Sequence, residues 1–196
     1  LPLPTMEPIY KWNVVPPSGS FEGAAHGDGS ALFGSRDEAF TRCGWCVVQV
    51  EKRGALVHCV ASLHGPLPGP LQTSPAAEAF GLLAYVFHAG MPPYIYHTDC
   101  QWVASSYLAG PSATAGAQHV HADIWRRVWR KVTDLGGAHV LAVVKVKAHS
   151  TMLDVENGRI GAVDRIANSM ADIGAKKAAT MHPSDPAVMR RCERTW

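Results

Sequence analysis

The chain has 196 residues, of which 47% are hydrophobic and 17% are charged, and its formal net charge is +2 with histidine neutral. This length is typical of one domain with a short appendage, and the apolar fraction excludes global disorder. Because the net charge is close to zero, any case for nucleic-acid binding depends on local groups of charges.

Composition also bears on compartment and membrane association. The longest apolar runs are far shorter than a membrane span, and the N-terminus lacks the basic and apolar regions of a signal peptide. Five cysteines, an odd number, indicate free thiols in a reducing intracellular compartment, without distinguishing cytoplasm from nucleus. Since no Met begins the chain, we expect it to be part of a larger polyprotein. We also expect a monomeric domain that does not bind membranes.

Three segments are predicted along the chain. Residues 1–20 contain five prolines and predict an extended lead-in without a folded element. Residues 21–180 carry regular strand and helix patterns and predict the folded domain. Residues 181–196 predict a loose tail.

The folded domain is predicted to begin with three strands. The first runs from Phe21 into a turn at Gly27-Asp28-Gly29, where the glycines let another group approach closely. Residues 44–50 and 55–63 are rich in β-branched residues and flank Lys52-Arg53-Gly54, which predicts a hairpin.

Helices and strands then alternate. A helix is predicted to be capped by Ser74, to begin at Pro75 and to end at Gly90. The later elements are a strand at 94–98, helices at 100–110 and 121–135, a strand at 139–147 and a helix at 162–179. The resulting order, β-β-β-α-β-α-α-β-α, predicts an α/β fold with a mixed sheet and helices on its faces.

Four carboxylates occupy informative positions in these elements. Asp28 and Asp99 each end a predicted strand, and they lie side by side if those strands are parallel neighbours. Glu78 falls in the first turn of its helix beside small alanines, and Asp172 falls in the last helix. Converging carboxylates repel one another unless a hard cation such as Mg²⁺ binds between them. Each acid alone is more typical of a turn or a solvated helix position, so the hypothesis depends on all four together.

The ordered segments that carry these acids resemble the type I ribonuclease H family, in particular the ribonuclease H domains of retroelement reverse transcriptases. The similarity extends over about 21–179. Its segments are GDGS (27–30), GWCVVQV (44–50), QTSPAAEAFGLLA (72–84), YHTDCQWV (96–103), KVKAHST (145–151) and ANSMADIGAKKA (167–178).

This resemblance implies a five-stranded mixed sheet flanked by helices and hydrolysis of the RNA strand of RNA–DNA hybrids. It implies that Asp28, Glu78, Asp99 and Asp172 bind two Mg²⁺ ions, for which Mn²⁺ can substitute. Asp164 is the weaker alternative to Asp172 as the fourth ligand. It also implies that the imidazole of His149 assists proton transfer or product departure.

The chain departs from the family near the substrate. Where the family often has asparagines that contact the ribose and backbone, this sequence has Gly34 and Thr73-Ser74-Pro75. We expect the hydroxyls of Ser30, Thr73 and Ser74 to contact the nucleic acid instead.

A basic helix face is the remaining candidate for substrate binding. Arg126, Arg127, Arg130 and Lys131 gather on one side of the predicted helix 121–135, opposite its tryptophans. This face either contacts phosphates, as the substrate-binding handle of the family does, or is an ordinary solvated face over an apolar core.

Three other functions remain open. A catalytically silent ribonuclease H-like module would bind nucleic acid without cleaving it, and a nuclease such as a resolvase would cut DNA. Cys43, Cys46, His58 and Cys59 could also bind zinc across the hairpin, although the turn explains their proximity without metal.

Overall fold

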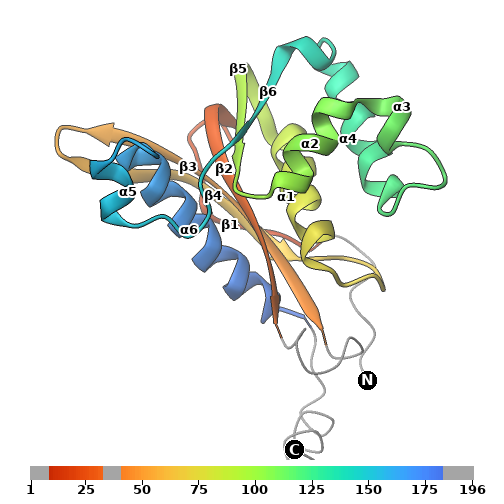
Figure 1. Ribbon diagram of the computed structural model, residues 1–196, viewed down its shortest axis with the longest axis horizontal. Coiled ribbons are helices and arrows are strands. Elements are labelled where there is room, and N and C mark those ends of the chain that lie inside the picture. The colour runs from red at the N-terminus through yellow and green to blue at the C-terminus, as the bar shows by residue number, and fades with distance from the viewer. Residues whose placement is uncertain (1–8, 33–40, 183–196) are drawn as a thin grey trace, which may run out of the picture.

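The computed structural model describes residues 9–32 and 41–182. Within these ranges the chain forms one six-stranded mixed sheet, ordered β1-β4-β3-β2-β5-β6, with helices on both faces (Figure 1). The predicted α/β architecture is confirmed, with one strand more than the five expected.

The elements have the following bounds. The strands are β1 (Lys11–Val14), β2 (Phe21–Leu32), β3 (Arg42–Arg53), β4 (Leu56–Pro66), β5 (Ala89–Thr98) and β6 (Leu141–Lys145). The helices are α1 (Ser74–His88), α2 (Gln101–Ala109), α3 (Pro111–Thr114), α4 (Ala122–Asp134), α5 (Met152–Glu156) and α6 (Ala162–Ala179).

The additional strand, β1, comes from the proline-rich lead-in. It pairs antiparallel with β4, so that Trp12 lies opposite Leu63. The Trp12 ring packs on Phe21 at a centroid distance of 5.1 Å and on His88 at 5.5 Å. The prediction that this part of the lead-in is unfolded was wrong because its prolines flank β1 without interrupting it. Residues 1–8 and the predicted tail beyond His182 lie outside the described residues.

The turn predicted at Gly27-Asp28-Gly29 is absent, because β2 continues through these residues and pairs with β3 as far as Leu32. The glycines nevertheless permit a close approach, as predicted. A Cβ atom on Gly27 would lie 1.8 Å from the Tyr96 hydroxyl, and one on Gly29 would lie 2.3 Å from the backbone nitrogen of Glu78.

Helix α1 begins one residue earlier than its predicted cap implies. Thr73, not Ser74, is the N-cap, because its Oγ1 accepts a hydrogen bond of 3.2 Å from the Ala76 amide. The Ser74 hydroxyl instead donates to the Gly29 carbonyl at 3.2 Å and ties α1 to β2. The helix ends at His88, and the chain passes directly into β5 at Ala89, so Gly90 lies within a strand.

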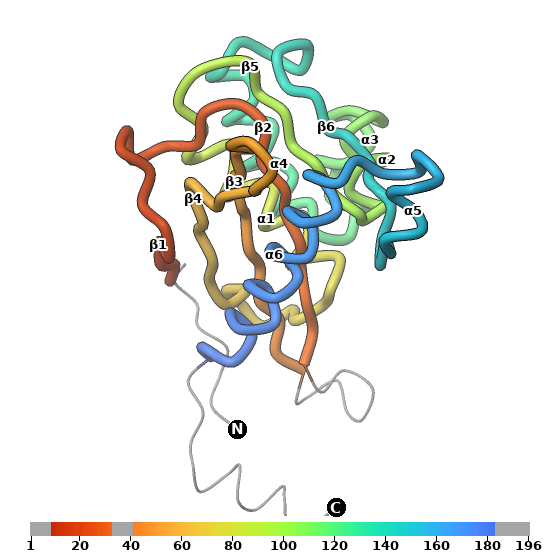
Figure 2. The backbone as a smooth tube through the Cα atoms, turned by 90° about the vertical axis from the view of Figure 1, so that its left-hand side faces the viewer, coloured from red at the N-terminus to blue at the C-terminus, as the bar shows by residue number. Residues whose placement is uncertain are grey.

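Two apolar clusters hold the helices against the sheet. The larger lies between the sheet and helices α1 and α4, and its largest side chains include Trp45, Tyr85 and Trp125. The smaller joins β3 to α6 on the other face, where small residues let the helix approach closely. Figure 2 shows α6 in front of the sheet and α1 and α4 behind it. Gly174 in α6 would clash with the Cys46 sulfur if it carried a Cβ atom, at 2.3 Å.

Membrane association and the state of the cysteines are the two properties on which composition raised expectations. No helix in the described ranges is both long and apolar enough to cross a membrane. The cysteines in those ranges, Cys43, Cys46, Cys59 and Cys100, are free thiols. The potential metal-binding groups found in the same part of the chain contain no cysteine, so the zinc site considered as an alternative across the hairpin does not form.

Candidate active site

The first two acids are brought together by the pairing of β2 with β5. These strands are parallel neighbours, the condition under which Asp28 and Asp99 were expected to lie side by side, and their last paired residues are Gly27 and Thr98. Asp28 and Asp99 directly follow this pair. Beyond it, β2 continues alongside β3 only, and the sheet is open on the side from which Glu78 approaches.

Glu78 reaches this opening because the N-terminal part of α1 lies against Gly29. Its carboxyl group is buried in the second turn of α1, not the first turn predicted, between Ala77 and Ala79, which are also buried. Asp28, Glu78 and Asp99 each offer one oxygen, and these three atoms lie within 4.8 Å of one another. These three of the four predicted ligands therefore converge on one site.

Burial and mutual repulsion raise the pKa of two acids of this cluster, Asp28 and Glu78. Burial, followed by the negative charges of Asp99 and Asp172, raises the pKa of Asp28 from 3.8 to about 7. Burial and the same kind of repulsion raise the pKa of Glu78 well above its usual range.

The donor set fits a hard divalent cation. All three groups supply oxygen, the ligand that Mg²⁺ prefers. In the described part of the chain, the buried Oε2 atom of Glu78 has no hydrogen-bond partner. A buried acceptor without a donor is costly, and a cation bound between the carboxylates would satisfy it and offset their mutual repulsion.

The predicted fourth ligand, Asp172, stands beside this cluster. It lies on α6, close enough to raise the pKa of Asp28, but outside the group of three converging oxygens that the described residues form. Its Oδ2 atom accepts a hydrogen bond of 2.7 Å from Lys176, one helical turn further on.

Asp164, the alternative fourth ligand, belongs to a different group. Its Oδ1 atom lies 3.0 Å from Nε2 of His26 and 3.7 Å from Nδ1 of His97. The carboxylate therefore faces two imidazoles on β2 and β5, and it does not join the carboxylate cluster formed within the described ranges.

Asn168 was not predicted as a site residue. Its Nδ2 atom donates a hydrogen bond of 3.0 Å to Oδ2 of Asp99, and the residue is buried. Asn168 lies four residues before Asp172, so both occupy the same face of α6. The four-residue spacing between Asn168 and Asp172 is the sequence pattern that could have identified Asn168. Its hydrogen bond to Asp99 places α6 against the end of β5.

His149 lies on the segment that links β6 to α5. Its side chain is exposed, its backbone is left-handed with φ of 46°, and it does not contribute to the carboxylate cluster of the described chain. The structure does not bring it together with the three acids, so its predicted role depends on movement of this segment.

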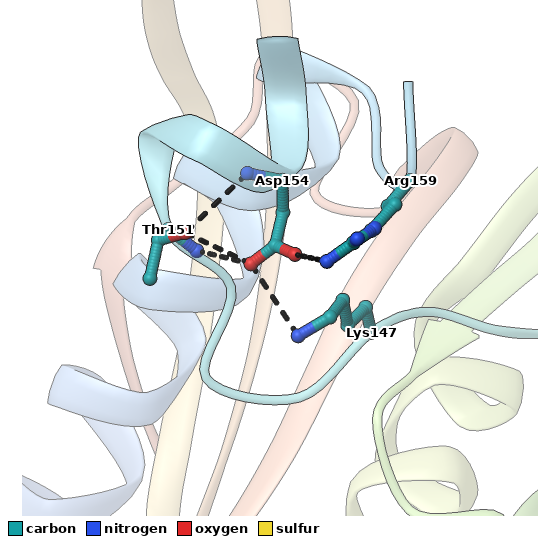
Figure 3. Close-up of polar contacts among 4 residues, drawn as sticks. All are labelled: Lys147, Thr151, Asp154 and Arg159. Atoms are coloured by element: carbon teal, nitrogen blue, oxygen red, sulfur yellow. Dashed lines mark hydrogen bonds and ion pairs between the residues drawn. The ribbon is translucent and has the colours of Figure 1, made fainter. Parts of the chain in front are cut away.

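The segment that carries His149 is fastened by Asp154 (Figure 3). Asp154 and Thr151 form a reciprocal capping box at the start of α5. The Asp154 carboxylate also accepts from Arg159 and pairs with Lys147, each at 3.3 Å. Hydrogen bonds from the backbone and hydroxyl of Thr151, together with these cations, hold the pKa of Asp154 well below its usual range.

The predicted basic face is present on α4. Ile124, Trp125 and Val128 are buried, whereas Arg126 and Arg130 on the opposite side are exposed. Three of the four cations make local contacts. Arg126 donates a hydrogen bond of 2.8 Å to the Ala115 carbonyl. The Arg127 guanidinium lies over the Phe80 and Phe87 rings, and the Lys131 ammonium lies over the Phe87 ring.

The predicted hydroxyl contacts lie at the same end of α1 as Glu78. Thr73 caps the helix and also contacts Nε2 of His121 at 3.2 Å, while Ser74 is bonded to Gly29. Ser30 is half-buried in β2 opposite Gly44. The hydroxyls of Thr73 and Ser74 thus already have intramolecular partners. Gly34 lies outside the described residues.

No protein-family model and no curated protein matches the sequence. The structure is similar to that of the prototype foamy virus protease–reverse transcriptase, with a TM-score of 0.61, 17% identity, and coverage of 80% of this chain and 20% of that one. The chain therefore spans about a fifth of the length of that protein.

Two shorter solved structures match over nearly their whole length. For the foamy virus ribonuclease H domain, the TM-score is 0.58 at 18% identity, covering 83% of this chain and 97% of that domain. For LC11-RNase H1 in complex with an RNA/DNA hybrid, the TM-score is 0.53 at 12% identity, covering 80% and 96%. The strand order, the helices on both faces and these superpositions together establish that the chain has the ribonuclease H fold.

Proposed function

We propose that this chain is a metal-dependent endonuclease that hydrolyses the RNA strand of RNA–DNA hybrids, as the ribonuclease H domain of a reverse transcriptase. The observation that carries the proposal is the convergence of Asp28, Glu78 and Asp99 within 4.8 Å, at the opening between β2 and β5. The fold supports the substrate class, since solved structures with this fold include one bound to an RNA/DNA hybrid. Its likeness to a protease–reverse transcriptase supports the larger context.

In this proposal the three converging carboxylates, with Asp172 beside them, would hold two Mg²⁺ or Mn²⁺ ions. Such ions supply a water-derived nucleophile and stabilise the leaving oxygen in phosphodiester hydrolysis. Asn168 orients Asp99 by donating to one of its oxygens, which leaves the other oxygen for a cation. Movement of Asp172 from Lys176 towards Asp28 would complete the predicted set of four.

The neighbouring surfaces are proposed to bind the hybrid. The α4 cations Arg126, Arg127, Arg130 and Lys131 would contact phosphates. The hydroxyls of Ser30, Thr73 and Ser74 lie on β2 and at the start of α1, near the carboxylate cluster, where they would contact the sugar–phosphate backbone. His149 would approach the product from its exposed segment and assist proton transfer or departure.

The proposal is tested by single-turnover cleavage of a labelled RNA–DNA hybrid. We expect cleavage with Mg²⁺ or Mn²⁺, none in EDTA, and binding without turnover in Ca²⁺, which prefers more ligands at longer distances. Asp99→Asn should abolish cleavage while the circular dichroism spectrum stays unchanged. Glu51→Gln, which removes an exposed acid from β3, is the matched control and should cleave normally.

Two results would redirect the assignment. Binding of the hybrid without cleavage in any metal would indicate a catalytically silent nucleic-acid-binding module. Cleavage of duplex DNA in preference to the hybrid would indicate a DNA nuclease such as a resolvase. Full activity in EDTA would contradict the metal-dependent mechanism altogether.

A further inference from the structure

We propose that His26, His97 and Asp164 form a second metal site, which binds Zn²⁺ and joins β2, β5 and the start of α6. This site is separate from the carboxylate cluster. The three side chains each offer one ligand atom, and these atoms lie within 4.8 Å of one another.

The sheet register brings the two histidines together. His26 and His97 are direct partners in the parallel pairing of β2 with β5. Their rings stack with centroids 4.4 Å apart and an interplanar angle of 29°, so their edges face the same side. Asp164, in the first turn of α6, places its carboxylate at these edges.

Hydrogen bonding leaves this group incompletely satisfied. Nε2 of His26 contacts Asp164 Oδ1 at 3.0 Å, but Nδ1 of His97 lies 3.7 Å from the same oxygen, which is too long for a hydrogen bond. Within the described chain, this His97 nitrogen is buried and has no hydrogen-bond partner. An unpaired nitrogen that faces a carboxylate across this distance is the arrangement that a bound cation would complete.

The donor atoms select the metal. Two imidazole nitrogens and one carboxylate oxygen suit Zn²⁺, whereas Mg²⁺ prefers oxygen alone. Tetrahedral Zn²⁺ with bonds of about 2.0–2.1 Å needs ligand atoms about 3.3 Å apart. The distances of 3.0 and 3.7 Å from the two imidazole nitrogens to Oδ1 of Asp164 bracket this separation. Three protein ligands would leave the fourth position for water.

The position of the site suggests its consequence. His26 precedes Asp28 by two residues on the same face of β2, and Asp164 precedes Asn168 by one turn of α6. A Zn²⁺ ion would therefore fasten the start of α6 to the two central strands. Because Asn168 donates to Asp99, the ion would also fix the helix that positions this acid.

The test is a titration of metal-free protein with Co²⁺, which reports tetrahedral ligation by its visible absorbance, and with Zn²⁺ by calorimetry. We expect one tight site per chain, with no absorbance from thiolate ligation, and a Zn²⁺-dependent rise in Tm. Asp164→Asn and His97→Gln should each weaken binding by at least about 10–100-fold, the usual cost of losing even an outer partner of a metal ligand. Both variants should lose the rise in Tm.

Two controls separate this site from its surroundings. His58→Gln removes an exposed histidine on β4 and should bind like the unmodified chain. Asp28→Asn should keep the tight Co²⁺ site, because it alters only the neighbouring carboxylate cluster. This readout does not depend on cleavage, so it is independent of the proposed nuclease activity. Failure of the unmodified chain to bind, thiolate absorbance, or unchanged affinity in both ligand variants would overturn the proposal.

Discussion

Asp28 shows how one residue combines packing, charge and chemistry. It lies between two glycines: the missing side chain of Gly27 admits the Tyr96 hydroxyl, and that of Gly29 admits the backbone of α1. This close packing removes Asp28 from water and sets it beside Glu78 and Asp99. The cost of burying these acids together appears as the raised pKa values of Asp28 and Glu78.

Replacement of Asp28 by Asn is expected to abolish cleavage and to stabilise the metal-free protein. The pKa of Asp28 is 3.8 in the unfolded chain and is raised to about 7 in the folded state. Between these two values the folded state therefore binds more protons than the unfolded state. The contribution of Asp28 to the free energy of unfolding is fully present below about pH 4 and is lost as the pH rises through about 7. At pH 8 in EDTA, Asp28→Asn should therefore unfold about 2–4 °C higher than the unmodified chain, corresponding to about 1 kcal/mol.

Thermal unfolding of both proteins from pH 4.5 to 8 checks this prediction. The difference in Tm should grow with pH, while Glu51→Gln on the exposed part of β3 should show no such trend. Parallel curves for Asp28→Asn and the unmodified chain would show that Asp28 is already ionised at low pH.

At the scale of elements, helix α4 and the segment from β6 to α5 lie outside the sheet and carry the remaining groups proposed to contact the nucleic acid. Helix α4 packs its tryptophans against the core and presents cations outward. The segment from β6 to α5 carries His149 and is held at its α5 end by the buried carboxylate of Asp154. The first element offers fixed charge, and the second offers a group whose position depends on a few polar contacts.

The basic face of α4 is expected to contribute to the salt dependence of hybrid binding. Arg126→Ala combined with Arg130→Ala should weaken binding and reduce the slope of log K against log salt by roughly two, one for each lost phosphate contact. Arg127 and Lys131 are kept, because they also pack on phenylalanine rings and their removal would disturb the core.

The matched control is Lys52→Ala combined with Arg53→Ala, which removes the same charge from the β3–β4 hairpin at the other end of the molecule (Figure 1). Fluorescence anisotropy over a range of salt concentrations measures both slopes. Equal slopes for the two double variants would identify the α4 cations as an ordinary solvated face.

The α5 segment is expected to position His149. Asp154→Ala removes the capping box and both ion pairs, so amide hydrogen exchange should accelerate in residues 147–161 while the sheet stays protected. Cleavage should slow to the same extent as in His149→Ala, by about 10²-fold, the lower end for general acid–base assistance.

The double variant Asp154→Ala/His149→Ala decides whether the two residues act together. If Asp154 acts by positioning His149, the double variant should be no slower than His149→Ala alone. Additive losses in single-turnover cleavage would mean that Asp154 contributes independently of the histidine. The lowered pKa of Asp154 predicts that this ordering is present above about pH 4 and is lost at lower pH.

At the scale of the whole molecule, the sheet extends to both sides of the functional strands. β2 and β5 lie inside the sheet, with β3, β4 and β1 on one side and β6 on the other. The edge strand β1 covers β4 and carries Trp12 onto the main core. The central strands that bear the acids are therefore supported by a core to which the N-terminal segment belongs.

Trp12→Ala is expected to lower the free energy of unfolding by about 2 kcal/mol, less than for a fully buried tryptophan because this side chain is only half-buried. The corresponding fall in Tm is about 4–8 °C. Lys11→Ala, an exposed neighbour on the same strand, is the control for thermal unfolding. The same Tm for both variants would mean that β1 contributes little to the domain.

The sequence by itself determined the elements whose patterns are local. The amphipathic period of α4, the hairpin at Gly54 and the order of the longer strands and helices from β2 to α6 all follow from neighbouring residues. The strands that lead to Asp28 and Asp99 also follow from the local patterns of the segments before these acids. Such features need no knowledge of distant parts of the chain.

Only the tertiary structure decided which distant residues meet. The glycines around Asp28 suggested a turn, but packing against Tyr96 and α1 uses them inside a strand. Asp164 and Asp172 could not be separated from spacing alone, because both lie on α6. The rotation of that helix gives Asp164 to the histidines and sets Asn168 against Asp99. The lead-in became β1 because β4 offered an edge for pairing, a partner that the local proline pattern does not reveal.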